Sequence, residues 1–162
     1  MANTQAMCTS FMSELMTATH NFGTAPTRGT SAADTFKAAL YLTTATIDAS
    51  TTAYSATNEV SGTNYTAGGV NVGSWNAPTP TNTSATAGTA FTTPAASITY
   101  GSGGSPVTLS TAFNAVLIYN STQSDKAVSV HTFGSQTITA GVFTLTMPPN
   151  TTSAALLRLA TT

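Results

Sequence analysis

Few side chains in this sequence could do catalytic or metal-binding chemistry. The two histidines, His20 and His131, lie far apart, and neither has a second histidine, a cysteine or a carboxylate at the spacing of metal ligands. There is no Gly-x-Ser-x-Gly motif and no close pair of carboxylates, and the glycine clusters at 68–69 and 101–104 lack the lysine of a phosphate-binding loop. The sequence therefore predicts no catalytic residue, no cofactor and no metal ion, and we expect that the protein is not an enzyme.

The cysteine and the histidines have structural interpretations. The single cysteine, Cys8, cannot form a disulfide within the chain, which suits a protein made in a reducing cytoplasm. His131 follows Val130 in a predicted strand, and we expect it to be a hydrogen-bonded histidine of a sheet. His20 is expected to end an N-terminal helix, where a cation interacts favourably with the helix dipole.

A helix is predicted over residues 4–18. Its apolar residues recur at helical spacing and form one wide stripe of Met7, Phe11, Leu15 and Ala18, with Cys8, Met12 and Met16 beside it. Two interpretations of the stripe remain open. It packs on the domain's own sheet, or its methionine-rich face docks on a neighbouring subunit. The residues predicted to contact a partner are Met7, Phe11, Met12, Leu15 and Met16.

Beyond the helix the patterns are those of strands. Residues 36–42 alternate as a half-buried strand, with Phe36, Ala38, Leu40 and Leu42 on one face and Tyr41 on the other. The continuous apolar run at 112–119 predicts a central strand buried on both faces, and 126–133 is its expected hairpin partner. Further short strands are expected at 69–75, 91–100, 136–140, 142–147 and 154–159.

Strands at a spacing of roughly 8–12 residues, separated by turn residues, predict an all-β fold, a jelly-roll-like β-sandwich with one N-terminal α-helix. Residues 43–57 are expected to be a polar loop. Residues 76–89 are low in hydrophobicity and rich in Pro, Thr and Ala, and they predict a long surface loop or arm. The organisation is a single domain over 1–162, with a helical segment at 1–20 and the sandwich at 21–162.

The composition is unusually poor in charge. Among 162 residues there are four Lys and Arg and five Asp and Glu, or 6% charged, against about one-quarter in typical soluble domains. The net charge of −1 without a basic cluster predicts no nucleic-acid partner. No apolar run approaches the ~18 residues of a membrane span, and no secretory signal is expected. A surface this neutral suits either a simple Thr-rich soluble domain or, as we expect, a protein covered by its neighbours in an assembly.

Several short motifs occur in a characteristic order. The central group is F-K-x-A-L-Y from Phe36, then Tyr54, Glu59-Val60-Ser61-Gly62-Thr63 and Tyr65-Thr66-Ala67-Gly68-Gly69. Upstream are CTSF-x-x-EL and His20-Asn21-Phe22, and downstream are LIYNST, DKAVSV, Phe133-Gly134 and FTLTMP. This order, from Cys8 to Leu159, resembles a family of small virion proteins of tailed bacteriophages, which are usually structural or capsid decoration (cement) proteins.

The resemblance implies a virion structural protein made in the host cytoplasm and located on the capsid surface. Its expected partner is the major capsid protein, whose lattice it would bind and stabilise, together with further copies of itself as a dimer or trimer. Neither a nucleic acid nor a membrane is expected as a partner. The alternative is a tail- or fibre-associated module that binds host glycans, with Trp75, Tyr54 and Tyr65 stacking on sugar rings.

Overall fold

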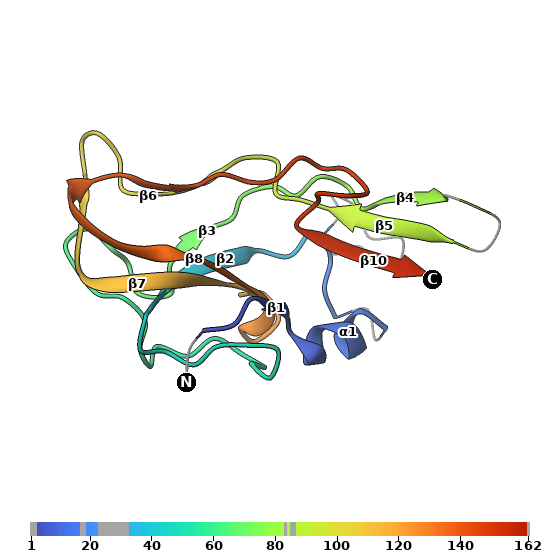
Figure 1. The fold of residues 1–162 in the computed structure, drawn as a ribbon, viewed down its shortest axis with the longest axis horizontal. Coiled ribbons are helices and arrows are strands. Elements are labelled where there is room, and N and C mark those ends of the chain that lie inside the picture. Colours follow the sequence, from blue (N-terminus) through green and yellow to red (C-terminus); the bar gives the residue numbers. More distant parts are fainter. Residues whose placement is uncertain (1–2, 17–18, 23–32, 83, 85–86, 162) are drawn as a thin grey trace.

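The computed structural model describes residues 3–16, 19–22, 33–82, 84 and 87–161. This part of the chain is nearly all β, with antiparallel sheets. Its strands are β1 (Ala6–Met7), β2 (Phe36–Leu42), β3 (Val70–Asn71), β4 (Thr79–Asn82), β5 (Gly88–Thr92), β6 (Ile98–Tyr100), β7 (Val107–Asn120), β8 (Lys126–Gly141), β9 (Phe143–Leu145) and β10 (Leu157–Thr161). One short helix, α1 (Thr9–Met16), lies below the sheets (Figure 1).

Five strands form the central sheet, in the order β1-β8-β7-β2-β3. β7 and β8 make a long hairpin, whose turn places Ser124 and Asp125 at φ angles of 55° and 57°. The apolar run of β7 from Ala115 to Tyr119 is wholly buried, and β7 lies between β8 and β2 in the sheet. The prediction of a central strand at 112–119 with a hairpin partner at 126–133 is confirmed.

β2 is buried on both faces, which corrects the prediction of a half-buried strand. Its residues exposed by at most 1% are Phe36, Ala38, Ala39, Leu40 and Tyr41. The face that was expected to be open is covered by the loop at 43–57. From this loop the carbonyl of Ser55 accepts a hydrogen bond from the Tyr41 hydroxyl, and the Tyr54 ring stacks on Tyr119 at a centroid distance of 4.8 Å. Alternation within a strand cannot reveal that the polar loop directly after it folds back over its second face.

A two-stranded sheet, β6 with β9, lies over the opposite face of the central sheet (Figure 1). Ile98 and Tyr100 of β6 point inward and are buried. The Tyr100 hydroxyl donates to the carbonyl of Ala38 in β2 at 2.9 Å, so a buried phenol links the two layers. Burial raises the pKa of Tyr100 well above its ordinary value, and the negative charge of Glu59 adds to the rise.

A three-stranded sheet in the order β10-β5-β4 extends from one end of the molecule, seen at the right of Figure 1. Part of it was predicted to be a loop at 76–89. The segment does lie on the surface, since every residue of β4 is exposed, but it is half of a hairpin with β5. Backbone pairing stabilises this hairpin with little apolar burial. Pro80 fits in β4 because the strand lies at a sheet edge.

The N-terminal segment also differs from its prediction. The helix expected over 4–18 is the shorter α1, because Ala6 and Met7 are paired with Val130 and Ser129 of β8. The backbone N–H of Cys8 continues this docking by donating to the carbonyl of Val128 at 3.1 Å. Tertiary pairing thus overrides the helical pattern before Thr9. Ala18, and the side chains of Met12 and Met16, lie outside the described part of the chain.

Two further predicted elements have different bounds. The strands expected at 126–133 and 136–140 are one strand, β8, because the β7–β8 ladder continues through several register shifts. The strand expected at 91–100 is divided between β5 and β6, with Pro94 in an isolated bridge to Trp75 between them. Within the described residues no helix has the length and apolarity needed to cross a membrane.

Gly69 marks the closest approach of the motif loop to the central sheet. Its φ angle is +73°, and a Cβ atom built on it would lie 1.8 Å from the carbonyl oxygen of Ala38. A side chain at this position would therefore force the loop away from β2. Gly73 has a similar φ of +80°, but nothing lies within 4 Å of the place where its Cβ would be.

We predict that Gly69→Ala destabilises the fold by about 3 kcal/mol or more, since it adds a backbone clash to the cost of a positive φ. Gly73→Ala is the matched control and should lose only about 1–2 kcal/mol, the cost of the positive φ alone. Urea unfolding measures both. Equal losses in the two variants would show that the contact between Gly69 and β2 is unimportant.

Candidate functional site

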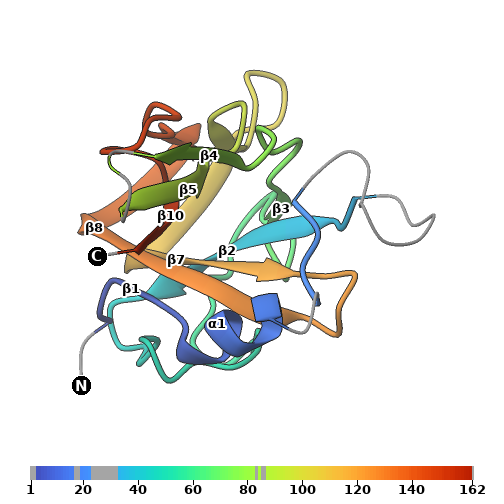
Figure 2. The same ribbon diagram turned by 90° about the vertical axis from the view of Figure 1, so that its right-hand side faces the viewer.

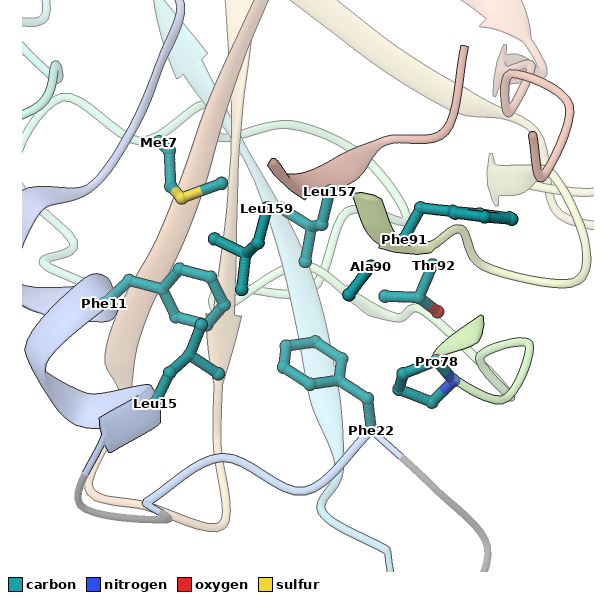
Figure 3. A pocket seen from close by; sticks show the side chains of 10 residues that line it. All are labelled: Met7, Phe11, Leu15, Phe22, Pro78, Ala90, Phe91, Thr92, Leu157 and Leu159. Atoms are coloured by element: carbon teal, nitrogen blue, oxygen red, sulfur yellow. The ribbon is translucent and has the colours of Figure 1, made fainter. Parts of the chain in front are cut away.

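An apolar groove lies between α1 and the three-stranded sheet, with a volume of about 100 Å³ (Figure 3). Its N-terminal side is formed by Met7, Phe11, Leu15 and Phe22. The opposite side is formed by Pro78, Ala90, Phe91, Thr92, Leu157 and Leu159. We call these residues the apolar groove. Leu157 and Leu159 alternate with Arg158 along β10, and their side chains point toward Phe11 and Phe22 (Figure 3).

The predicted partner-contacting residues have different places in this groove. Phe11 is only 2% exposed and belongs to the core, where its ring meets Phe22 edge-on at 5.9 Å. Met7 and Leu15 are half-buried and line the groove. The side chains of Met12 and Met16 are outside the described part of the molecule. The groove thus brings together three of the five predicted residues and adds a second wall that the helical stripe could not indicate.

A polar network holds α1 in place. The two carboxylate oxygens of Glu14 accept hydrogen bonds from His20 Nε2 and Lys126 Nζ, each at 2.7 Å. His20 Nδ1 accepts from the side-chain amide of Asn120 at 3.0 Å, which also donates to Asp34 at 2.7 Å. We therefore assign the imidazole proton to Nε2. Burial raises the pKa of Glu14, but the hydrogen bonds from Lys126 and His20 outweigh it and leave this pKa below its ordinary value.

His20 is therefore not the helix-ending cation that the sequence predicted. α1 ends at Met16, and the His20 side chain is fully buried among Glu14, Asn120 and the Phe11 ring. The helix pattern placed His20 near the end of α1, but it could not show that the His20 side chain is buried against Asn120 of β7.

His131 is a hydrogen-bonded histidine of the sheet, as predicted. Its Nε2 lies 2.9 Å from the hydroxyl of Ser129, two residues earlier on β8. This pair has the composition of a nucleophile and a base, but Ser129 is only 2% exposed and no hydrogen bond from a described residue reaches His131 Nδ1 to orient the ring. Burial lowers the pKa of His131 to about 4. The arrangement supports a structural role.

Cys8 and the acidic residues form no other reactive centre in the described segments. Burial raises the pKa of Cys8 to about 11, with a further contribution from Asp48, so its unreactive thiol form predominates at neutral pH. Among the described residues, no three of the His, Cys, Asp and Glu side chains gather where they could hold a metal ion.

Glu59 is the centre of a second polar network, which the sequence did not reveal. Its carboxylate accepts hydrogen bonds from the hydroxyls of Tyr54 at 2.6 Å and Tyr65 at 2.7 Å, and from the N–H of Gly68 at 2.8 Å. The Tyr65 hydroxyl in turn accepts from the N–H of Leu40 in β2 at 3.0 Å. The residues that carry the motif therefore fasten the loop to the central sheet.

The same network shields the tyrosines. Burial is the leading cause that raises the pKa of Tyr65 and Tyr54, and the hydrogen bond to Glu59 raises both further. Burial also raises the pKa of Tyr41 and Tyr119 to about 12. With Tyr100, these are all five tyrosines of the chain.

Comparison of the chain with protein-family models, with curated proteins and with solved structures finds no match.

We predict that Glu59→Gln lowers the free energy of unfolding by about 1.5–3 kcal/mol, because an amide offers one acceptor oxygen where the carboxylate offers two charged ones. Hydrogen exchange at the Gly68 amide should accelerate. Asp48→Asn is the control, since that carboxylate bonds only Ser50 at the surface, and its loss should be clearly smaller. An unchanged Gly68 exchange rate in Glu59→Gln would contradict the network.

A second prediction concerns alkaline pH. Each tyrosine binds its proton more tightly in the folded chain than in the unfolded chain, whose tyrosine pKa is about 10. The contribution to stability is therefore fully present below pH 10, and it is lost as the pH rises from 10 toward 12 and beyond. Phenolate absorbance should stay low at pH 10 and rise together with the loss of β-sheet circular dichroism. A separate, ordinary titration in the folded state would contradict this expectation.

Proposed function

We propose that this chain is a virion structural protein of a tailed bacteriophage, a decoration or cement protein that binds and stabilises the major capsid lattice on the capsid surface. The observation that carries the proposal is that the residues of the motif have a structural role. Tyr54, Glu59, Tyr65 and Gly69 all fix a loop on a central sheet, which supports a role as a rigid scaffold.

The proposed fold is a jelly-roll-like β-sandwich. The five-stranded sheet and the β6–β9 sheet over it supply two layers with a shared core that includes Leu40, Ile98 and Tyr100. The end-on view in Figure 2 supports this layered arrangement, with α1 below the central sheet and the three-stranded sheet above it. Such a domain presents strand edges and short loops for adhesion, and needs no moving part.

Attachment is proposed to be apolar and to involve the groove. With four basic and five acidic side chains in the whole sequence, few ion pairs with a partner are available. Met7 and Leu15 keep part of their surface exposed beside a groove walled by Leu157 and Leu159. The major capsid protein is the proposed partner. Occupancy of many equivalent sites would stabilise the closed lattice by mass action.

The glycan-binding alternative receives no support from the placement of its aromatic residues. Trp75 is 8% exposed and packs edge-on against Phe22 at 4.8 Å. Tyr54 stacks on Tyr119, and the hydroxyls of Tyr54 and Tyr65 are both bound to Glu59. These three rings do not form an exposed platform for a sugar.

We predict that capsid binding is insensitive to salt. Exposed ion pairs contribute at most about 1 kcal/mol each and are screened by salt, whereas apolar burial is strengthened by salting-out. Raising sodium chloride should leave the bound fraction on purified virions unchanged or slightly increased, and mild urea should release the protein before the shell opens. Band intensities on a denaturing gel, compared with the major capsid band, give both the copy number and the release. Release by moderate salt alone, or only a few copies per virion, would overturn the proposal.

The role of the groove in capsid binding is tested by the variant Leu15→Asp. This substitution places a charge beside Phe22 and keeps the core residue Phe11. This variant should bind stripped capsids about tenfold more weakly, corresponding to roughly 1.4 kcal/mol. Val142→Asp is the control, because Val142 is a 48% exposed apolar residue in the β8–β9 connection and does not line the groove. Circular dichroism verifies that both variants are folded. Equal binding by the two variants would remove the groove from the attachment site.

A further inference from the structure

The outer edge of β10 is an unpaired strand edge. On one side β10 pairs with β5 in an unbroken antiparallel register from Leu157↔Thr92 to Thr161↔Gly88. On the other side, no backbone hydrogen bond from another described residue reaches it. Arg158, Leu159 and Ala160 are all exposed. A regular edge of this kind is a ready template for another strand.

The other sheet edges are protected against strand addition. β4 carries Pro80, which has no N–H to donate. β1 and β3 are only two residues long, and β6 and β9 three. The free part of β8 belongs to a ladder with repeated register shifts, and Ala140 there has a φ of 47°. β10 has no proline, and its ladder with β5 runs without a bulge or a register shift.

Charged side chains do not protect the edge of β10 against strand addition either. Its one charged residue is Arg158, whose guanidinium donates to the carbonyls of Ser153 at 2.8 Å and Thr152 at 3.4 Å. These bonds hold the cation against its own chain. Leu159, in contrast, is a large apolar residue that is 46% exposed beside the groove.

We propose that β10 pairs antiparallel with β10 of a second copy of this chain. A strand is complementary to itself in an antiparallel pair, so the same patch serves both copies around a two-fold axis. A register centred on Leu159 pairs all five residues of β10 and sets the two Leu159 side chains opposite each other. The second copy is favoured over a foreign strand because, in this register, the one charged residue of the edge, Arg158, lies opposite Ala160 of the other copy, and its guanidinium is already bound to carbonyls of its own chain.

The pairing would join the two three-stranded sheets into one continuous sheet of six strands. The exposed surface of Leu159 would be buried at the seam, and the two grooves would lie on the same side of this sheet, because Leu157 and Leu159 share one face of β10. The inference goes beyond the proposed function and is tested on the purified protein, without capsids.

The test is a charge exchange at Leu159. Leu159→Asp and Leu159→Lys each place like charges opposite each other across the seam, and each should raise the dimer dissociation constant about tenfold or more. An equimolar mixture of the two variants should restore the dimer, because Asp then faces Lys. Val142→Asp, an equally exposed apolar position away from β10, should dimerise like the wild type. Sedimentation equilibrium measures the masses.

Hydrogen exchange provides a readout that does not depend on the variants. Amides of residues 157–161 in the wild-type chain should be protected more strongly as protein concentration increases, while those of β3 should not change. A wild-type protein that remains monomeric, an Asp–Lys mixture that remains monomeric, or protection independent of concentration would overturn the proposal.

Discussion

The carboxylate of Glu59 is the constraint on which the arrangement of this domain depends. A partly buried negative charge must be compensated by a cation or by several hydrogen bonds. Glu14 is compensated by the Lys126 cation and by a hydrogen bond from His20, whereas Glu59 accepts from three neutral donors. These donors come from three places in the motif loop, so satisfying one carboxylate fixes the whole loop. The Tyr65 hydroxyl then transmits this constraint to the backbone of Leu40 in the central sheet.

Much of the strand order was accessible from the sequence because burial in a sheet leaves local patterns. The continuous apolar run at 112–119 predicts a central strand, and this segment lies within β7. The pattern of Phe36–Leu42 was misread because the cover over Tyr41 comes from a polar loop. The hairpin of β4 and β5 was missed for a related reason: backbone pairing stabilises it, and Thr79–Asn82 contribute no buried side chain by which it could be detected.

Only one of the two walls of the apolar groove could be predicted from the sequence. Helical spacing identified Met7, Phe11 and Leu15, but the wall of Leu157 and Leu159 depends on how distant strands pack, which periodicity does not encode. The Glu59 network had a weak signal, since one acidic residue stood between two tyrosines in a chain with very few charges. The hydroxyls and the carboxylate can be seen in the sequence, but their convergence within 2.7 Å depends on the folded path of the loop, which has no local pattern.

The groove is assembled from segments that are synthesised far apart in time. Phe11 and Leu15 leave the ribosome early, whereas Leu157 and Leu159 follow only after the central hairpin. Contacts of such long sequence separation form late in folding. A nascent chain, or one that has failed to dock its last strand, therefore has no groove to offer. Any partner that binds the groove would therefore bind only chains whose last strand has docked.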